Sequence, residues 1–186
     1  AKRRADLARQ AVQYRLRLAV IDPLTGLFNR RHALPQLAAI AADARQTGRE
    51  FAVMVVDLDR FKAVNDRWGH AAGDTVLSEV ARRLAADLRP EDLAARIGGE
   101  EFLVALPDTG LAEARAVAQR LCSAVEAGRI RLPGGGSLTV TVSIGLAIGG
   151  RGSVETAESV LDRADRALLV SKSEGRNQVT VGRSAA

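Results

Sequence analysis

The sequence predicts an α/β fold in which a central, mostly antiparallel sheet is flanked by helices. Short apolar runs typical of buried strands are mixed with longer amphipathic stretches, without the strict alternation that indicates a parallel sheet. Two of these runs, 93–97 and 102–106, are separated only by a short segment with a Gly-Gly pair, which is typical of an antiparallel hairpin. The length of 186 residues fits one globular domain with a short appendage.

Residues 1–20 form the appendage and the domain covers 21–186. Four apolar or aromatic residues recur at spacings of four, three and four, which is typical of a coiled-coil seam: Leu7, Ala11, Tyr14 and Leu18. A stable coiled coil needs about three or four heptads, and this seam is shorter. We expect an N-terminal helical extension that enters from an upstream sensor domain. A frayed, exposed helix is the alternative.

The positive charge of the chain is concentrated in this segment. Residues 1–20 hold six Lys or Arg and one Asp, whereas the rest of the chain has 21 basic and 21 acidic side chains. A basic tail with almost no aromatic residues on a neutral domain is a weak signature of nucleic-acid binding. We therefore expect no nucleic-acid partner.

The sequence carries no membrane or secretion signal. It has no run of about 18 apolar residues, and its first residues are charged rather than apolar. Cys122 is the single cysteine, which excludes an internal disulfide and fits a reducing compartment. We expect a cytoplasmic domain, and the sequence leaves open whether the full protein is tethered to a membrane.

The elements follow in order along the chain. The Pro and Gly at 22–26 end the first helix, and a second helix is expected at about 28–47. The continuous apolar run 51–56 is typical of a central strand buried on both faces. The remaining expected elements are a short helix at 60–66, a helix at 74–88 stopped by Pro90, the hairpin, a helix at 110–127, a strand at 138–148 after a glycine loop, a helix at 155–173 and an edge strand at 178–181.

Two adjacent acids, Glu100 and Glu101, stand at the tip of the predicted hairpin, directly after Gly98 and Gly99. We expect the two glycines to supply the positive φ angles that a tight turn requires. Paired acids on a stiff turn suit divalent-metal chemistry, because a hard cation takes oxygen ligands. An ordinary solvated hairpin tip is the alternative.

Asp57 ends the buried strand, so three carboxylates meet at one sheet end if this strand lies beside the hairpin. Between Leu58 and Lys62 the strand turns into a helix, whose free N–H groups and dipole favour phosphate, and Lys62 adds a positive charge. Together these features predict a metal-dependent nucleotide site.

Over about residues 20–182 the chain resembles the catalytic domain of GGDEF-family diguanylate cyclases. The motifs that carry the resemblance occur in family order: Asp22-Pro23-Leu24-Thr25-Gly26-Leu27-Phe28-Asn29-Arg30-Arg31, Asp57-Leu58-Asp59-Arg60-Phe61-Lys62, Asn65-Asp66, Gly69-His70-Ala71-Ala72-Gly73-Asp74, Gly98-Gly99-Glu100-Glu101-Phe102, Thr141-Val142-Ser143-Ile144-Gly145, and Lys172 with Gly175-Arg176-Asn177. The resemblance implies a sheet of the nucleotidyl-cyclase or polymerase-palm type.

The family joins two GTP molecules into cyclic di-GMP and releases two pyrophosphates, each 3′-hydroxyl attacking the α-phosphate of the nucleotide held on a facing subunit. The resemblance therefore implies a Mg²⁺-dependent cyclase, with Mn²⁺ as a substitute ion, that works as a homodimer on GTP. A catalytically weak cyclic di-GMP receptor is the alternative, although degenerate receptors usually lose signature acids that this chain keeps.

By resemblance, Asp57 and Glu100 bind the metal together with the carbonyl of Leu58. Glu101 lies close by as a third catalytic acid, and Glu100 also serves as the base.

By the same resemblance, three basic side chains neutralise the β- and γ-phosphates: Lys62, Lys172 and Arg176. The backbone of Arg60 and Phe61 cradles these phosphates. The last helix lacks the usual Tyr and Ala of the family, which leaves the placement of Lys172 open.

Asn65 and Asp74 correspond to the guanine-reading residues of the family. A carboxylate can accept hydrogen bonds from N1–H and the 2-amino group of guanine, which adenine lacks, so Asp74 also argues against an altered nucleotide choice. Leaving such an acceptor unpaired costs about 1–3 kcal/mol. The alternatives are that Asp74 caps the following helix and that Asn65 is a turn residue.

Arg89 and Asp92 match the RxxD product-inhibition site of the family in type and in offset from the signature, and Arg120 falls where a second arginine contacts cyclic di-GMP. The planar guanidinium fits O6 and N7 of guanine. A surface ion pair at a helix stop is the alternative.

Overall fold

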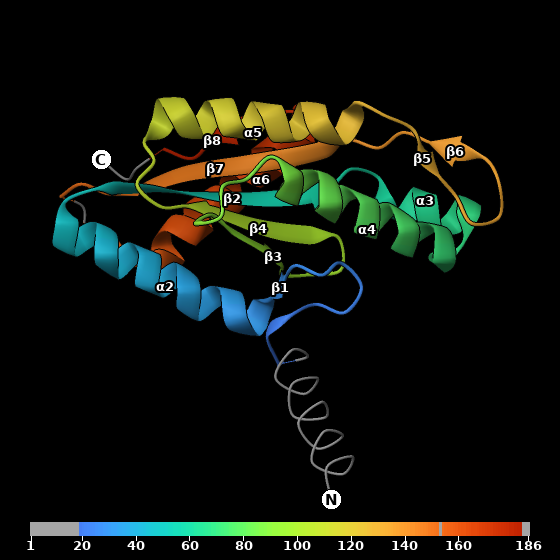
Figure 1. Ribbon diagram of the computed structural model, residues 1–186. Coiled ribbons are helices and arrows are strands. Elements are labelled where there is room, and N and C mark those ends of the chain that lie inside the picture. Colours follow the sequence, from blue (N-terminus) through green and yellow to red (C-terminus); the bar gives the residue numbers. More distant parts are fainter. Residues whose placement is uncertain (1–18, 153, 184–186) are drawn as a thin grey trace, which may run out of the picture.

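The centre of the molecule is a six-stranded sheet in the order β1-β3-β4-β2-β7-β8 (Figure 1). The computed structural model describes residues 19–152 and 154–183. The strands are β1 (Phe28–Asn29), β2 (Glu50–Leu58), β3 (Leu93–Arg96), β4 (Glu101–Leu106), β7 (Val142–Gly150) and β8 (Val179–Val181). The inner pairs β3–β4, β4–β2 and β2–β7 are antiparallel, whereas the edge strands β1 and β8 run parallel to their neighbours. The mostly antiparallel sheet is confirmed.

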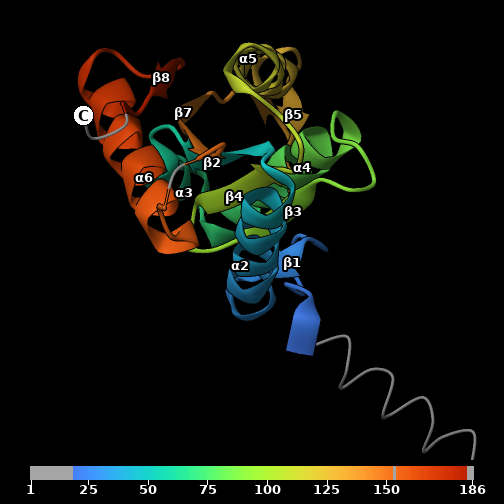
Figure 2. The same cartoon turned by 90° about the vertical axis from the view of Figure 1, so that its left-hand side faces the viewer.

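Helices cover both faces of this sheet: α2 (Arg30–Thr47), α3 (Phe61–Trp68), α4 (His70–Ala86), α5 (Leu111–Glu126) and α6 (Ala157–Ser173). Side chains of β2 point alternately to the two faces. Met54 and Val56 join the core under α4 and α5, and Val53 and Val55 join the core under α2 and α6 (Figure 2). The continuous apolar run is therefore explained by burial on both faces, as predicted.

The starts of two helices differ from the predictions. Residues 28–29 belong to β1, and α2 begins at Arg30, where Asn29 caps it by accepting a hydrogen bond from the His32 N–H at 3.0 Å. The helix expected from 74 begins at His70. The break lies at Gly69, whose φ is +83°, while Gly73 sits within the helix.

The strand expected at 138–148 is two separate elements. Residues Ser137–Leu138 form β6, which pairs with β5 (Ile130–Arg131) in a small hairpin that the sequence analysis did not foresee. Gly135 and Gly136 have positive φ angles and turn the chain there. The long strand β7 starts only at Val142. Figure 1 shows this hairpin at the same end of the molecule as α3.

The backbone of α6 lies directly on β7. A Cβ atom at Gly145 would overlap the carbonyl oxygen of Ala164 and the amide nitrogen of Leu168. Only glycine permits this approach, which fixes α6 against the central strands of the sheet. Lys172 lies near the end of this helix.

The helix expected over 1–20 lies outside the described residues except for positions 19 and 20. Within 19–152 and 154–183, no helix is both long and apolar enough to cross a membrane.

Candidate active site

The predicted acids meet at one end of the sheet because β2 and β4 are neighbours. Asp57, near the end of β2, is the register partner of Glu101, the first residue of β4. The Leu58 N–H donates a hydrogen bond of 3.1 Å to the Glu100 carbonyl. The condition for the convergence of the three acids is thus fulfilled.

The Gly-Gly turn has a different basis from the one predicted. Neither Gly98 nor Gly99 has a positive φ. A Cβ at Gly98 would lie 2.7 Å from Oε2 of Glu101, so this glycine makes room for a carboxylate. The guanidinium of Arg96 holds the turn by donating to the carbonyls of Gly98 at 3.2 Å and Gly99 at 2.8 Å.

Arg96 also connects the turn to the entry segment of the domain. Its Nη1 lies 3.4 Å from Oδ1 of Asp22, which accepts hydrogen bonds from the N–H and hydroxyl of Thr25. Burial alone would raise the pKa of Asp22, but the hydrogen bonds of Thr25 and the charge of Arg96 lower it overall. The sequence analysis gave Arg96 no role, although its place beside the glycines was a signal.

Asp57 and Glu100 form an electrostatically unfavourable pair. Burial raises the pKa of Asp57, and Lys172, whose Nζ lies 2.9 Å from Oδ2, opposes this rise. Burial also raises the pKa of Glu100, and the negative charge of Asp57 raises it further. A cation placed between these carboxylates would relieve their repulsion.

This donor set fits a magnesium ion. Asp57, Glu100 and the Leu58 carbonyl offer hard oxygen atoms, the ligands that Mg²⁺ prefers. Among the described residues, no group of three or more His, Cys, Asp or Glu side chains is arranged as a metal cluster. Mg²⁺ typically uses one or two carboxylates and completes its shell with water and substrate phosphates, so two acids suffice.

Three of the predicted phosphate-binding residues lie at the start of α3: Arg60, Phe61 and Lys62. Arg60 has a φ of 56° and turns the chain into α3, whose first N–H groups lack intrahelical partners. Lys62 is solvent-exposed and contacts Asp66 at 2.7 Å. In the part of the chain that the structure describes, Arg176 forms no ion pair or side-chain hydrogen bond, and its charge lowers the pKa of Asp57. The structure thus brings Arg176 and Lys172 to Asp57.

Asp59 is a residue whose function the sequence analysis missed. Its buried carboxylate accepts hydrogen bonds from the hydroxyls of Thr141 at 2.7 Å and Ser143 at 2.6 Å, and from the Asn177 N–H at 3.1 Å. Arg176 and Asn177 both have positive φ angles, of 66° and 48°. Asp59 therefore ties the end of β2 to the start of β7 and to this strained turn. Its signal was the repeated Asp of 57–59.

Both predicted guanine readers lie within helices. Asn65 is in α3 and Asp74 is the exposed fifth residue of α4, so the turn and cap alternatives are wrong. Oδ1 of Asn65 is the only buried side-chain nitrogen or oxygen without a hydrogen-bond partner among the described residues. A Cβ at Gly73 would overlap this atom, so the Asn65 side chain occupies room that only a glycine at 73 leaves free. An unpaired buried acceptor costs about 1–3 kcal/mol, which a ligand donor would remove.

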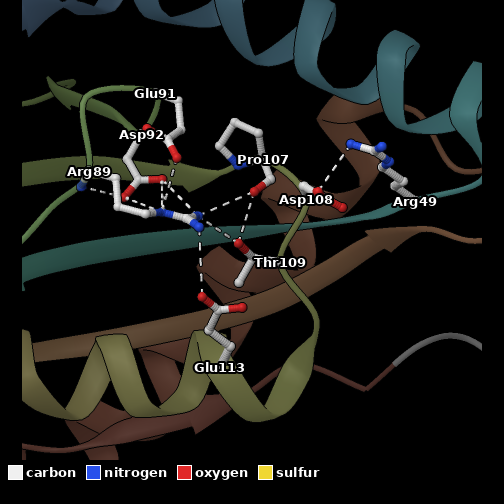
Figure 3. Close-up of polar contacts among 8 residues, drawn as sticks. All are labelled: Arg49, Arg89, Glu91, Asp92, Pro107, Asp108, Thr109 and Glu113. Atoms are coloured by element: carbon white, nitrogen blue, oxygen red, sulfur yellow. Dashed lines mark hydrogen bonds and ion pairs between the residues drawn. The ribbon is translucent and has the colours of Figure 1, made fainter.

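The predicted inhibitory residues Arg89 and Asp92 lie in the turn before β3 (Figure 3), and Arg120 lies on α5. Arg89 and Asp92 contact each other, with Nη2 and Oδ1 3.1 Å apart, and Arg89 also donates to Thr109 at 2.9 Å and lies 3.7 Å from Glu113. Arg120 pairs instead with Asp87 of the α4 end, at 3.1 Å.

Comparisons with known proteins show which family the chain resembles. The family model described as "Diguanylate cyclase, GGDEF domain" matches residues 19–178. Response regulator PleD of Caulobacter vibrioides is 43% identical over 186 residues, covering 99% of this chain, which spans only 40% of the length of PleD.

Among solved structures, the coiled coil and GGDEF domain of DgcB from Caulobacter crescentus, in complex with c-di-GMP, superposes with a TM-score of 0.88 at 32% identity and covers 97% of this chain and 94% of that one. The active GGEEF domain of a diguanylate cyclase from Vibrio cholerae gives a TM-score of 0.77 at 25% identity, with coverages of 84% and 98%. The family model spans most of the chain and the sheet is that of solved GGDEF domains, so this chain belongs to the GGDEF domain family of diguanylate cyclases.

Proposed function

We propose that this domain condenses two GTP molecules into cyclic di-GMP with release of two pyrophosphates. The observation that carries the proposal is the meeting of Asp57 and Glu100 at the end of the sheet, beside Lys172 and Arg176. Two acids that repel each other next to two cations suit a divalent ion together with a polyphosphate. Mg²⁺, with Mn²⁺ as its substitute, would be held by Asp57, Glu100 and the Leu58 carbonyl.

In this proposal, the 3′-oxygen of each GTP attacks the α-phosphorus of the other, and at each α-phosphorus the bond to the bridging oxygen breaks, so that two phosphodiester bonds form and two pyrophosphates leave. Glu100 accepts the proton of the hydroxyl as the general base. Glu101 fixes the turn beside it. When bound, the metal ion neutralises phosphate charge and lowers the pKa of the attacking hydroxyl.

The phosphates are held by the chain itself. The N–H groups of Arg60 and Phe61 at the start of α3 cradle them, because a helix N-terminus favours negative charge. Lys62, Lys172 and Arg176 neutralise the β- and γ-phosphates. Lys172, which contacts Asp57 in this structure, would pair with a phosphate instead if Asp57 held the metal.

The choice of guanine is assigned to Asn65 and Asp74. Both offer acceptor oxygens to N1–H and the 2-amino group of guanine, and the unpartnered Oδ1 of Asn65 supports this assignment. Adenine lacks the 2-amino donor, so ATP would leave acceptors unpaired at a cost of about 1–3 kcal/mol.

A homodimer follows from the reaction, because each subunit offers one nucleotide site and the product contains two nucleotides. We propose that the segment before residue 21, driven by an upstream sensor domain, sets the geometry between the subunits. Product inhibition is assigned to Arg89, Asp92 and Arg120. The relative DgcB was solved in complex with c-di-GMP, which supports binding of this ligand.

The test is an incubation of the purified protein with GTP and Mg²⁺, followed by separation and identification of the nucleotides. Cyclic di-GMP should form with GTP but not with ATP. The Glu100→Ala variant should be inactive, and Glu158→Ala, which removes an exposed acid from α6, should be as active as the wild type. Full activity of Glu100→Ala would show that the metal site is wrongly assigned. A dimer forced by a fused coiled coil that binds cyclic di-GMP without making it would identify a receptor.

A further inference from the structure

A second pocket lies on the flank of α3 that faces away from the guanine readers. Its volume is about 410 Å³, and it is bounded by α3, by residues 138–141 and by residues 175–177. The α3 side consists of Arg60, which precedes the helix, and of positions 63, 64, 67 and 68, a spacing that defines one face of a helix. Asn65, by contrast, contacts Gly73 of α4.

Three arginines from two segments line this pocket: Arg60 and Arg67 on the α3 side, and Arg176. None of them forms an ion pair or a side-chain hydrogen bond with a described residue, and Arg67 only lies over the ring of Trp68, 5.1 Å from its centroid. The acid in the pocket wall, Asp59, already accepts three hydrogen bonds from the protein. The pocket therefore carries an excess of positive charge.

The geometry points to a small polyphosphate as the ligand. Arginine forks form charge-assisted pairs of hydrogen bonds with phosphate oxygens, and three unpaired forks match a compact anion with several charges. Arg60 and Arg176 line this pocket and also belong to the proposed binding site for the phosphates of GTP at the N-terminus of α3. A leaving pyrophosphate would thus need only a short displacement to enter.

We propose that this pocket binds inorganic pyrophosphate, the group that the cyclase releases, and holds it beside the nucleotide site. The identity of the ligand rests on the proposed function, whereas the anion site rests on the three arginines alone. Arg67 is the residue that separates the two sites, since it lines the pocket and has no part in nucleotide binding.

Trp68 provides the readout. It is the only tryptophan of the chain, it lines the pocket and it is 38% exposed, so its fluorescence reports on occupancy. The protein is titrated with pyrophosphate in the absence of divalent ions, and calorimetry gives the same constant independently of the ring. Sulfate at equal ionic strength is the control for a general anion effect.

Three variants locate the binding. Arg67→Ala should weaken pyrophosphate binding about tenfold, because a charge-assisted hydrogen bond is worth at least about 1.4 kcal/mol. Lys62→Ala, which alters the nucleotide side, and Arg115→Ala, which removes an exposed arginine of α5, should leave the constant within about twofold.

An unchanged constant in Arg67→Ala, a loss confined to Lys62→Ala or an equal response to sulfate would each overturn the pocket. Cyclic di-GMP synthesis is measured separately. If Arg67→Ala loses pyrophosphate binding while the wild type makes no cyclic di-GMP, the anion site stands and the proposed function fails. If synthesis of cyclic di-GMP is normal and Arg67→Ala binds pyrophosphate as the wild type does, only the proposed pyrophosphate pocket is refuted.

Discussion

Removal of the Asp59 carboxylate should cost the domain a large part of its stability. The side chain is 7% exposed and accepts three hydrogen bonds, from Thr141, Ser143 and Asn177, of 2.6 to 3.1 Å. Hydrogen bonds to a charged group are each worth about 1.5–3 kcal/mol. The two hydroxyls can rotate towards other acceptors, but the Asn177 N–H cannot. We therefore expect Asp59→Ala to lower the free energy of unfolding by about 3–5 kcal/mol.

Urea unfolding of the isolated domain measures this change. Asp59→Asn keeps one carbonyl oxygen but places an amide group near the other donors. Its free energy of unfolding should therefore fall by a smaller amount, about 1–3 kcal/mol. The matched control is Asp66→Ala, which removes an exposed acid of α3 whose partner is the exposed Lys62, and it should change stability by less than about 0.5 kcal/mol.

Catalysis gives a second readout that mere destabilisation would not give. Asp59 fixes the N–H of Asn177 and so the turn that carries Arg176, a proposed phosphate ligand. In Asp59→Asn, below its unfolding temperature, the KM for GTP should rise more than kcat falls. Stability of Asp59→Ala within about 1 kcal/mol of the wild type, or an unaltered KM in Asp59→Asn, would refute the reasoning.

Three further predictions follow from close contacts and charges. Gly145→Ala should destabilise the domain by about 2 kcal/mol or more in urea unfolding, because the new Cβ overlaps the backbone of Ala164, and an unchanged midpoint would contradict this. The pKa of Glu100 is raised in the folded state, so ionisation of this carboxyl lowers the stability of the domain as pH rises through that pKa. Without divalent ions, Glu100→Gln should therefore have a higher melting temperature than the wild type at neutral pH. At about pH 3, where the carboxyl is protonated in both states, the two melting temperatures should be equal. Glu113→Gln removes a carboxylate 3.7 Å from Arg89 and should tighten cyclic di-GMP binding about two- to fivefold by calorimetry, whereas equal or weaker binding would argue against competition for that arginine.

The sequence predicted the elements whose signals are local. The apolar run of β2 and the two strands around the Gly-Gly pair needed no information from elsewhere in the chain, and all three exist close to the predicted bounds. Glycine was harder to interpret. Gly69 breaks the chain between two helices with a positive φ, whereas Gly73 lies inside α4 and Gly98 serves packing, and composition cannot distinguish these uses.

Sequence motifs predicted which acids lie together at the site, but they did not predict the hydrogen bonds between distant residues that hold the surrounding segments. Asp57 and Glu101 were expected to meet, and the sheet register places them opposite each other. The partners of Asp59 lie 82 to 118 positions further along the chain, so no local pattern could indicate that it holds three donors. The contact of Lys172 with Asp57, likewise, depends on how closely α6 packs on the sheet.

These differences have a common physical basis. Asp57 and Glu100 repel each other, and Oδ1 of Asn65 is buried without a partner, so these three residues, all proposed to touch ligands, have unfavourable or incomplete interactions within the described part of the chain. Asp59 and Arg96 are well supplied with partners and hold the segments on either side. A rigid, well-paired surrounding can keep mutually repelling acids in place for the proposed cation and nucleotide, because a flexible one would let the acids move apart. We therefore expect Asp59 and Arg96, which touch no proposed ligand, to matter to the geometry of the site through these hydrogen bonds.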